Sequence, residues 1–100
     1  MSDNLSRSVF TIEVDHRPVL MFSTRFYADA QAICTDDRMR QKLSSVSSGG
    51  KSLCDDIAII RVRLARPEEK VKYLEETATR AHETGLVVVY LVKLDRAPAY

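Results

Sequence analysis

The stretch DIAIIRVRLARPEEKVKYLEETATRAHETGLVVVYLVKL, residues 56–94, decides the fold class. Within it, an apolar segment at 57–64 is followed by a polar segment opened by Pro67 and then by a second apolar segment at 86–94. Proline suits the first position of a helix, and Gly85 suits its end. The pattern therefore predicts a strand, a helix and a strand in close succession.

The predicted helix has an acidic first turn and one apolar stripe. Glu68 and Glu69 suit the positive end of the helix dipole. Helical spacing places four apolar residues on one face, which we expect to pack on the sheet: Val71, Leu74, Ala78 and Ala81.

Two shorter apolar segments nearer the N-terminus predict a β hairpin. Apolar and polar residues alternate over 9–14, as in a half-buried strand, and an extended apolar pattern resumes over 19–22. The polar interruption between them holds His16 and Pro18, and proline belongs near the start of its strand. An alanine-rich segment after Thr24 predicts the first helix.

The order strand, strand, helix, strand, helix, strand predicts an α+β fold with a four-stranded mixed sheet and two main helices. The hairpin is expected to be antiparallel, and the crossover near the C-terminus parallel and right-handed. Residues 36–46 predict further helical turns, either as the bent end of the first helix or as a separate one. We expect a single domain over 1–100, with flexible ends at 1–7 and 95–100.

The composition excludes several classes of protein. Fifteen basic residues nearly balance 14 acidic ones, which weighs against a general nucleic-acid or membrane-surface binder. No secretory leader or apolar run of spanning length is recognised, so we expect a cytoplasmic protein. Cys34 and Cys54 are then expected to be free, buried thiols, although the sequence leaves open whether either is reactive.

No motif for catalysis or for a cofactor survives inspection. Gly50-Lys51-Ser52 resembles the end of a phosphate-binding loop, but its first glycine would fall at Ser45. Each cysteine stands alone, whereas zinc ligands come in closely spaced pairs, and neither histidine has a spacing that brings it to a cysteine. We therefore predict no catalytic residue, no metal and no cofactor.

Arg61 and Arg63 are the best candidates for contact with an anion. They lie two residues apart and so share one face of a predicted strand, where two guanidinium groups can bind a carboxylate or phosphate. The alternative is that both pair with carboxylates of the same chain.

The last strand is apolar on both faces. Val87, Val89 and Leu91 point one way, opposite a second apolar set formed by Leu86, Val88, Tyr90, Val92 and Leu94. If both helices lie on the same side of the sheet, the first set stays exposed, which predicts a homodimer through Val87, Val89 and Leu91. One helix on each side of the sheet would leave little apolar surface exposed.

Three segments carry a resemblance to known proteins: residues 12–20, the alanine and cysteine residues at 32–34, and residues 89–95. In these segments the chain resembles small uncharacterised bacterial proteins of similar length. The resemblance implies no activity and no site residue, because none is assigned to that group.

The sequence thus predicts a small noncatalytic interaction or regulatory module that associates with itself through an apolar sheet face or a sheet edge. The alternative is a small-molecule binder, or an enzyme, that uses a pocket between the sheet and the helices with Cys34 or Cys54 near its mouth.

Overall fold

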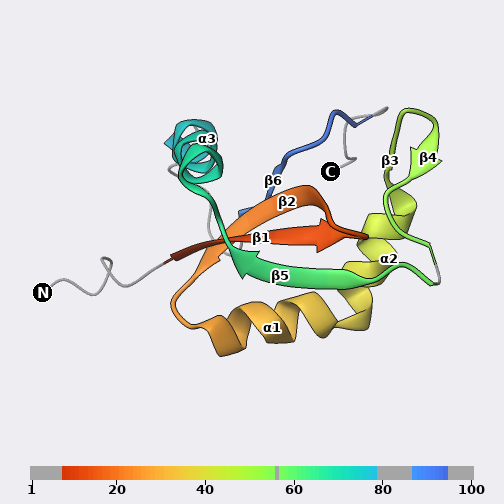
Figure 1. The fold of residues 1–100 in the computed structure, drawn as a ribbon, viewed down its shortest axis with the longest axis horizontal. Helices are drawn as coiled ribbons and strands as arrows, with labels where there is room; N and C mark the ends of the chain where they lie inside the picture. Colours follow the sequence, from red (N-terminus) through yellow and green to blue (C-terminus); the bar gives the residue numbers. More distant parts are fainter. Residues whose placement is uncertain (1–7, 56, 79–86, 95–100) are drawn as a thin grey trace, which may run out of the picture.

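The computed structural model describes residues 8–55, 57–78 and 87–94. The described residues form three helices and six strands, which confirms the α+β class (Figure 1). In chain order they are β1 (Ser8–Val14), β2 (Arg17–Thr24), α1 (Tyr27–Thr35), α2 (Asp37–Ser45), β3 (Ser47–Ser48), β4 (Lys51–Ser52), β5 (Ile60–Leu64), α3 (Pro67–Ala78) and β6 (Val89–Tyr90).

The main sheet is antiparallel, with strand order β5-β1-β2-β6. The predicted mixed sheet is therefore wrong, because β5 and β6 lie on opposite edges instead of side by side. The turn of the hairpin explains the placement of β5. The Asp15 N–H donates to the carbonyl of Ile59 at 2.9 Å, and the Ile59 N–H donates to the Asp15 carboxylate at 3.0 Å. These bonds hold the start of β5 against β1, so the chain must cross the hairpin before it forms β6.

The predicted hairpin is confirmed and has a two-residue turn. Asp15 and His16 have φ values of 50° and 69°, the left-handed conformation that such turns require. Along the hairpin, the partner of Ile12 is Leu20 but the partner of Glu13 is Pro18, so Val19 is an extra residue that forms a β-bulge.

Helices cover both faces of the sheet (Figure 1). Helices α1 and α2 pack on the face that carries Phe10, Ile12 and Leu20, and this side holds the larger core. Helix α3 packs on the other face, where Val9, Met21 and Val89 form a smaller cluster with Tyr73. The structure thus has the arrangement that was expected to leave little apolar surface open.

Several boundaries differ from the sequence prediction. The segment over 36–46 forms a separate helix, α2, whose first turn is capped by Asp36 through the Arg38 N–H at 2.8 Å. Residues 47–52, which are rich in serine and glycine, form the β3-β4 hairpin, with Gly49 and Gly50 at positive φ. The last strand, β6, pairs with β2 only over Val89–Tyr90. The other described residues of 87–94 form no regular strand pairing.

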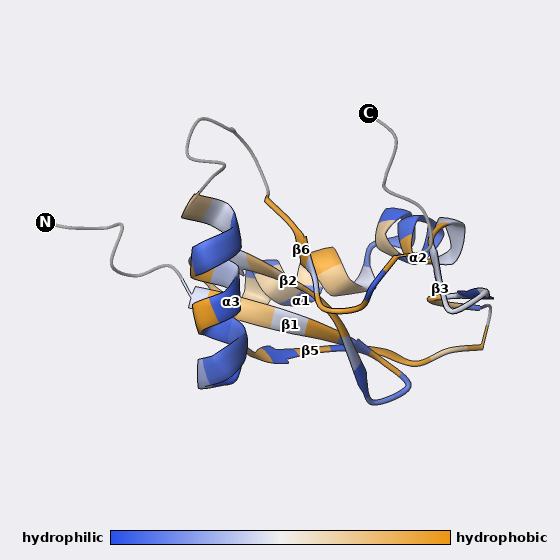
Figure 2. Ribbon diagram, turned by 90° about the horizontal axis from the view of Figure 1, so that it is seen from above, coloured by the Kyte–Doolittle hydropathy of each residue, from blue (hydrophilic) through white to orange (hydrophobic). Residues whose placement is uncertain are grey.

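The predicted apolar stripe of α3 is wrong. Its buried residues are Glu69 and Tyr73, whereas Val71 and Leu74 are 54% and 56% exposed. Ala81 lies outside the described residues. In Figure 2, α3 is mainly hydrophilic in colour while β6 is hydrophobic. The helix is therefore held on the sheet by polar contacts as much as by apolar ones. In the described part of the chain, no helix has the length and hydrophobicity needed to cross a bilayer.

Candidate functional site

Arg63 already has two carboxylate partners within the chain. Its Nε donates to Glu13 at 2.7 Å, and its Nη1 and Nη2 donate to the two oxygens of Glu69 at 2.9 and 3.0 Å. The alternative reading of this arginine, an internal ion pair, is the one that the structure shows. Arg63 cannot bind an external anion without giving up one of these partners.

Glu69 completes a buried polar cluster beneath α3. Its carboxylate accepts hydrogen bonds from the Thr11 hydroxyl at 2.9 Å and from the Arg66 N–H at 2.8 Å. Bonding to Arg63, helped by these two donors, lowers the pKa of Glu69 to about 2 although burial opposes the shift. The carboxylate closes the first turn of α3 and ties it to β1 and β5. We infer that this cluster is structural: it fixes the start of α3 on the sheet, and it is called the clamp below.

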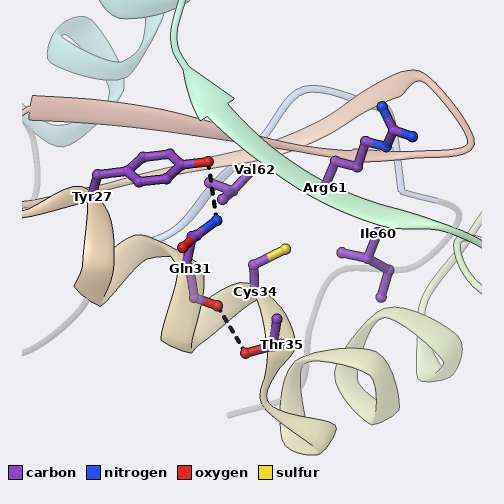
Figure 3. A pocket seen from close by; sticks show the side chains of 7 residues that line it. All are labelled: Tyr27, Gln31, Cys34, Thr35, Ile60, Arg61 and Val62. Carbon is purple, nitrogen blue, oxygen red and sulfur yellow. Dashed lines mark hydrogen bonds between the residues drawn. The ribbon is translucent and has the colours of Figure 1, made fainter.

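Arg61 is exposed, and its side chain points away from α1 (Figure 3). It lies opposite Glu13 in the register of β5 and β1. None of the described residues forms an ion pair with it, so the second predicted anion contact remains free to meet a charge on another molecule.

The three residues predicted to form a dimer interface lie on the α3 side of the sheet. Val89 is only 3% exposed, because it packs in the small cluster with Tyr73, and Leu91 packs against that cluster. The carbonyl of Val87 accepts a hydrogen bond from the Tyr73 hydroxyl at 3.1 Å. The expectation that these side chains are exposed to solvent on the sheet face is therefore wrong for Val89, because helix α3 buries it within the protomer.

A pocket of about 370 Å³ lies between α1 and the edge strand β5 (Figure 3). The helix contributes Tyr27, Gln31, Cys34 and Thr35, and the strand contributes Ile60, Arg61 and Val62. The pocket is mixed in character: Cys34 and the two aliphatic side chains form its apolar part, and the Tyr27 hydroxyl accepts a hydrogen bond from Gln31 at 3.3 Å. It matches the predicted location of a pocket between sheet and helices with Cys34 beside it.

The outer edge of β5 offers main-chain hydrogen-bonding groups. The Ala65 N–H donates to the Val9 carbonyl, and the Asp15 N–H donates to that of Ile59, so the odd-numbered residues of this segment face β1. Because the direction alternates along an antiparallel strand, the N–H and C=O groups of Ile60, Val62 and Leu64 point to the outer edge. Of these groups, the Leu64 carbonyl already accepts a hydrogen bond from Arg63 Nη1 at 3.1 Å. In the described part of the sheet, β5 pairs only with β1.

The side chains along this edge are apolar and partly exposed. Ile60, Val62 and Leu64 face the α1 side, where Leu64 is 62% exposed, and Tyr27 on α1 is 50% exposed. Natural proteins commonly protect an edge strand with a proline, an inward charge or a covering loop. Strand β5 carries one such protecting charge, the exposed Arg61, but among the described residues no other strand pairs with its outer edge.

The cysteines have the environment of packed side chains. Both are buried thiols, at 6% exposure for Cys34 and 3% for Cys54. Burial raises the pKa of the Cys34 thiol, which lowers its thiolate fraction and its nucleophilicity. Of the two histidines, His16 sits in the hairpin turn, and His82 lies outside the described residues. Within the described ranges, no three His, Cys, Asp or Glu side chains gather as a metal site.

Comparison with known proteins adds no relative. The chain matches no family model, no curated protein and no solved structure. Its resemblance to small bacterial proteins stays a prediction, and the functional argument has to come from the geometry of the β5 edge.

Sequence reasoning had found Arg61 and Arg63, and it had offered a sheet edge and a pocket between sheet and helices, but it had assigned neither of them to β5. The missing information was the strand order, since 60–64 reads equally well as a central strand. The alternation of apolar and basic residues over 60–64 was the available signal, because central strands seldom carry two charged residues on one face.

Proposed function

We propose that this protein is a cytoplasmic, noncatalytic interaction module that binds an extended polypeptide segment by adding it as a strand to β5. The observation that carries the proposal is the outer edge of β5, which pairs with no other described strand. This edge lies beside the pocket between β5 and α1, called the groove below. Of the two association surfaces expected from the sequence, a sheet face or a sheet edge, the proposal keeps the edge, because helices occupy both faces.

The edge and the groove supply different parts of the recognition. Main-chain groups of Ile60, Val62 and Leu64 can bond a strand of any sequence, which contributes affinity. On the α1 side, alternate side chains of the bound segment meet the groove and the exposed surfaces of Tyr27 and Leu64, which favours apolar residues. On the opposite side they meet Arg61, which favours an acidic residue. The preferred segment thus alternates apolar and acidic residues.

Among the described residues that line the groove, none is an activated nucleophile, which supports a binding role. Cys34 lines the groove, but its raised pKa keeps the thiol protonated near neutral pH. Among the other described groove residues, Tyr27, Gln31 and Thr35 bond to one another or to the helix backbone, which suits a static wall.

A synthetic peptide of alternating valine and glutamate tests the proposal. Added to ¹⁵N-labelled protein, it should shift the amide signals of Ile60 and Val62 and those of the facing turns of α1. A peptide of alternating valine and lysine should bind more weakly, because its charges oppose Arg61.

The Val62→Pro variant is the matching control. Proline removes an N–H that points to the free edge and leaves the bonds to β1 intact, whereas Val62→Ala keeps the donor. The proposal predicts loss of the peptide response in the first variant and its retention in the second. With the protein shown by light scattering to be monomeric at the concentration used, no shift at β5 with the peptide at millimolar concentration, or an equal response from Val62→Pro, would refute it.

A further inference from the structure

We infer that the segment bound at this edge is β5 of a second copy, so that two protomers form one continuous eight-stranded sheet. This inference rests on the proposed function and names its partner. The argument comes from the self-complementarity of Ile60–Leu64 in one particular register.

A strand that pairs antiparallel with its own copy lies across a two-fold axis, so one residue faces itself. Only the outward residues can exchange main-chain hydrogen bonds, and Val62 is the middle one of the three. An axis at Val62 pairs Val62 with itself and Ile60 with Leu64 of the second copy. All three outward residues are then used on each side, and each pair exchanges two hydrogen bonds. The Leu64 carbonyl already accepts a bond from Arg63 Nη1 at 3.1 Å and would accept the intermolecular one with its second lone pair.

The side chains fit this register on the α1 face. Ile60 of one copy meets Leu64 of the other, so an aliphatic pair forms at each end of the contact. The exposed surface of Leu64, 62% in the protomer, is then covered by an apolar neighbour. The two α1 helices approach each other along the same face, where each presents the half-exposed ring of Tyr27.

Charge selects the same register on the opposite face. With the axis at Val62, Arg61 lies opposite Arg63 of the second copy, and Arg63 already holds Glu13 and Glu69. One positive and two negative groups leave that cluster with a net single negative charge, so Arg61 meets an opposite charge. An axis at Arg61 would place the two free Arg61 side chains directly against each other, which is unfavourable.

Disulfide trapping tests the register directly. Val62→Cys should link to itself under mild oxidation, since residues that face each other across antiparallel strands have Cα atoms about 5.5 Å apart. Ile60→Cys and Leu64→Cys should each fail to self-link, yet they should link to each other when mixed. Lys72→Cys, on the exposed side of α3, measures random collisions. We expect Val62→Cys to link on the order of a hundredfold faster than this control.

The mass in solution provides the second measurement. Light scattering after gel filtration should give a dimer for the wild-type protein and a monomer for Val62→Pro, with the far-ultraviolet circular dichroism unchanged. A wild-type monomer at high micromolar concentration overturns the inference, as does a dimer that survives Val62→Pro or a Val62→Cys linking rate equal to that of Lys72→Cys.

The outcomes separate this inference from the proposed function. If the wild-type protein is a monomer that still binds the valine and glutamate peptide at β5, only the identity of the partner is wrong. If the peptide also fails to perturb β5, both statements fall.

Discussion

Replacing Glu69 by glutamine should cost the protein about 2 to 4 kcal/mol of folding free energy near neutral pH. The carboxylate is 8% exposed and accepts hydrogen bonds from Arg63, Thr11 and the Arg66 N–H. Its pKa falls from 4.5 to about 2 on folding. At ~1.4 kcal/mol for each pH unit, that difference corresponds to about 3 kcal/mol. The glutamine keeps the shape of the side chain and removes the charge that this figure describes.

The pH dependence of the stability lost in Glu69→Gln follows from the direction of the Glu69 pKa shift on folding. Because the folded-state pKa lies below the unfolded value, the contribution is fully present above 4.5 and is lost as the pH falls toward about 2. Urea unfolding followed by circular dichroism should therefore show a large gap between wild type and Glu69→Gln at neutral pH. The gap should shrink steadily below pH 4.5.

Glu68→Gln is the matched control, since Glu68 is the exposed neighbour of Glu69 in the same helical turn. It should change stability by no more than about 0.5 kcal/mol. The clamp assigned to Glu69 is refuted if Glu69→Gln costs no more than Glu68→Gln at neutral pH, or if its cost is the same at pH 2 as at pH 7.

Two further predictions concern the hairpin turn and the groove. His16→Gly should raise the free energy of unfolding by up to about 1 kcal/mol in urea denaturation, because His16 has a φ of 69° that glycine adopts without strain; a destabilised variant would contradict this reading of the turn. Cys34 should react slowly with a thiol reagent in the folded protein near neutral pH and quickly in urea, since burial raises its pKa. Mass spectrometry locates the labelled cysteine. Rapid labelling of Cys34 in the folded protein would favour the alternative, a reactive thiol in the groove.

The sequence predicted those parts of the fold that depend on local patterns. The hairpin, the helical turns over 36–46 and the start of α3 at Pro67 were readable because turn, helix and proline preferences act over a few residues. The strand order was not readable, because it depends on contacts such as that of Asp15 with Ile59, which lie 44 residues apart.

The face of α3 was misread for a related reason. Periodicity assigns the apolar residues Val71 and Leu74 to the core, but the sheet beneath the helix offers Thr11 and Arg63, which select Glu69. A buried carboxylate is visible only when its partners on other strands are known. The same lack of strand order hid the edge of β5 and, with it, the candidate site.

The two strands at the middle of the sheet are also neighbours along the chain, which bears on how the protein folds. The hairpin of β1 and β2 closes through a turn of two residues, so it forms with little loop-closure entropy, whereas both outer strands join from distant segments. During synthesis this hairpin emerges before the two outer strands and can serve as a template for them. Fluctuations that detach an outer strand would leave the central ladder closed, so amide exchange should be slowest there.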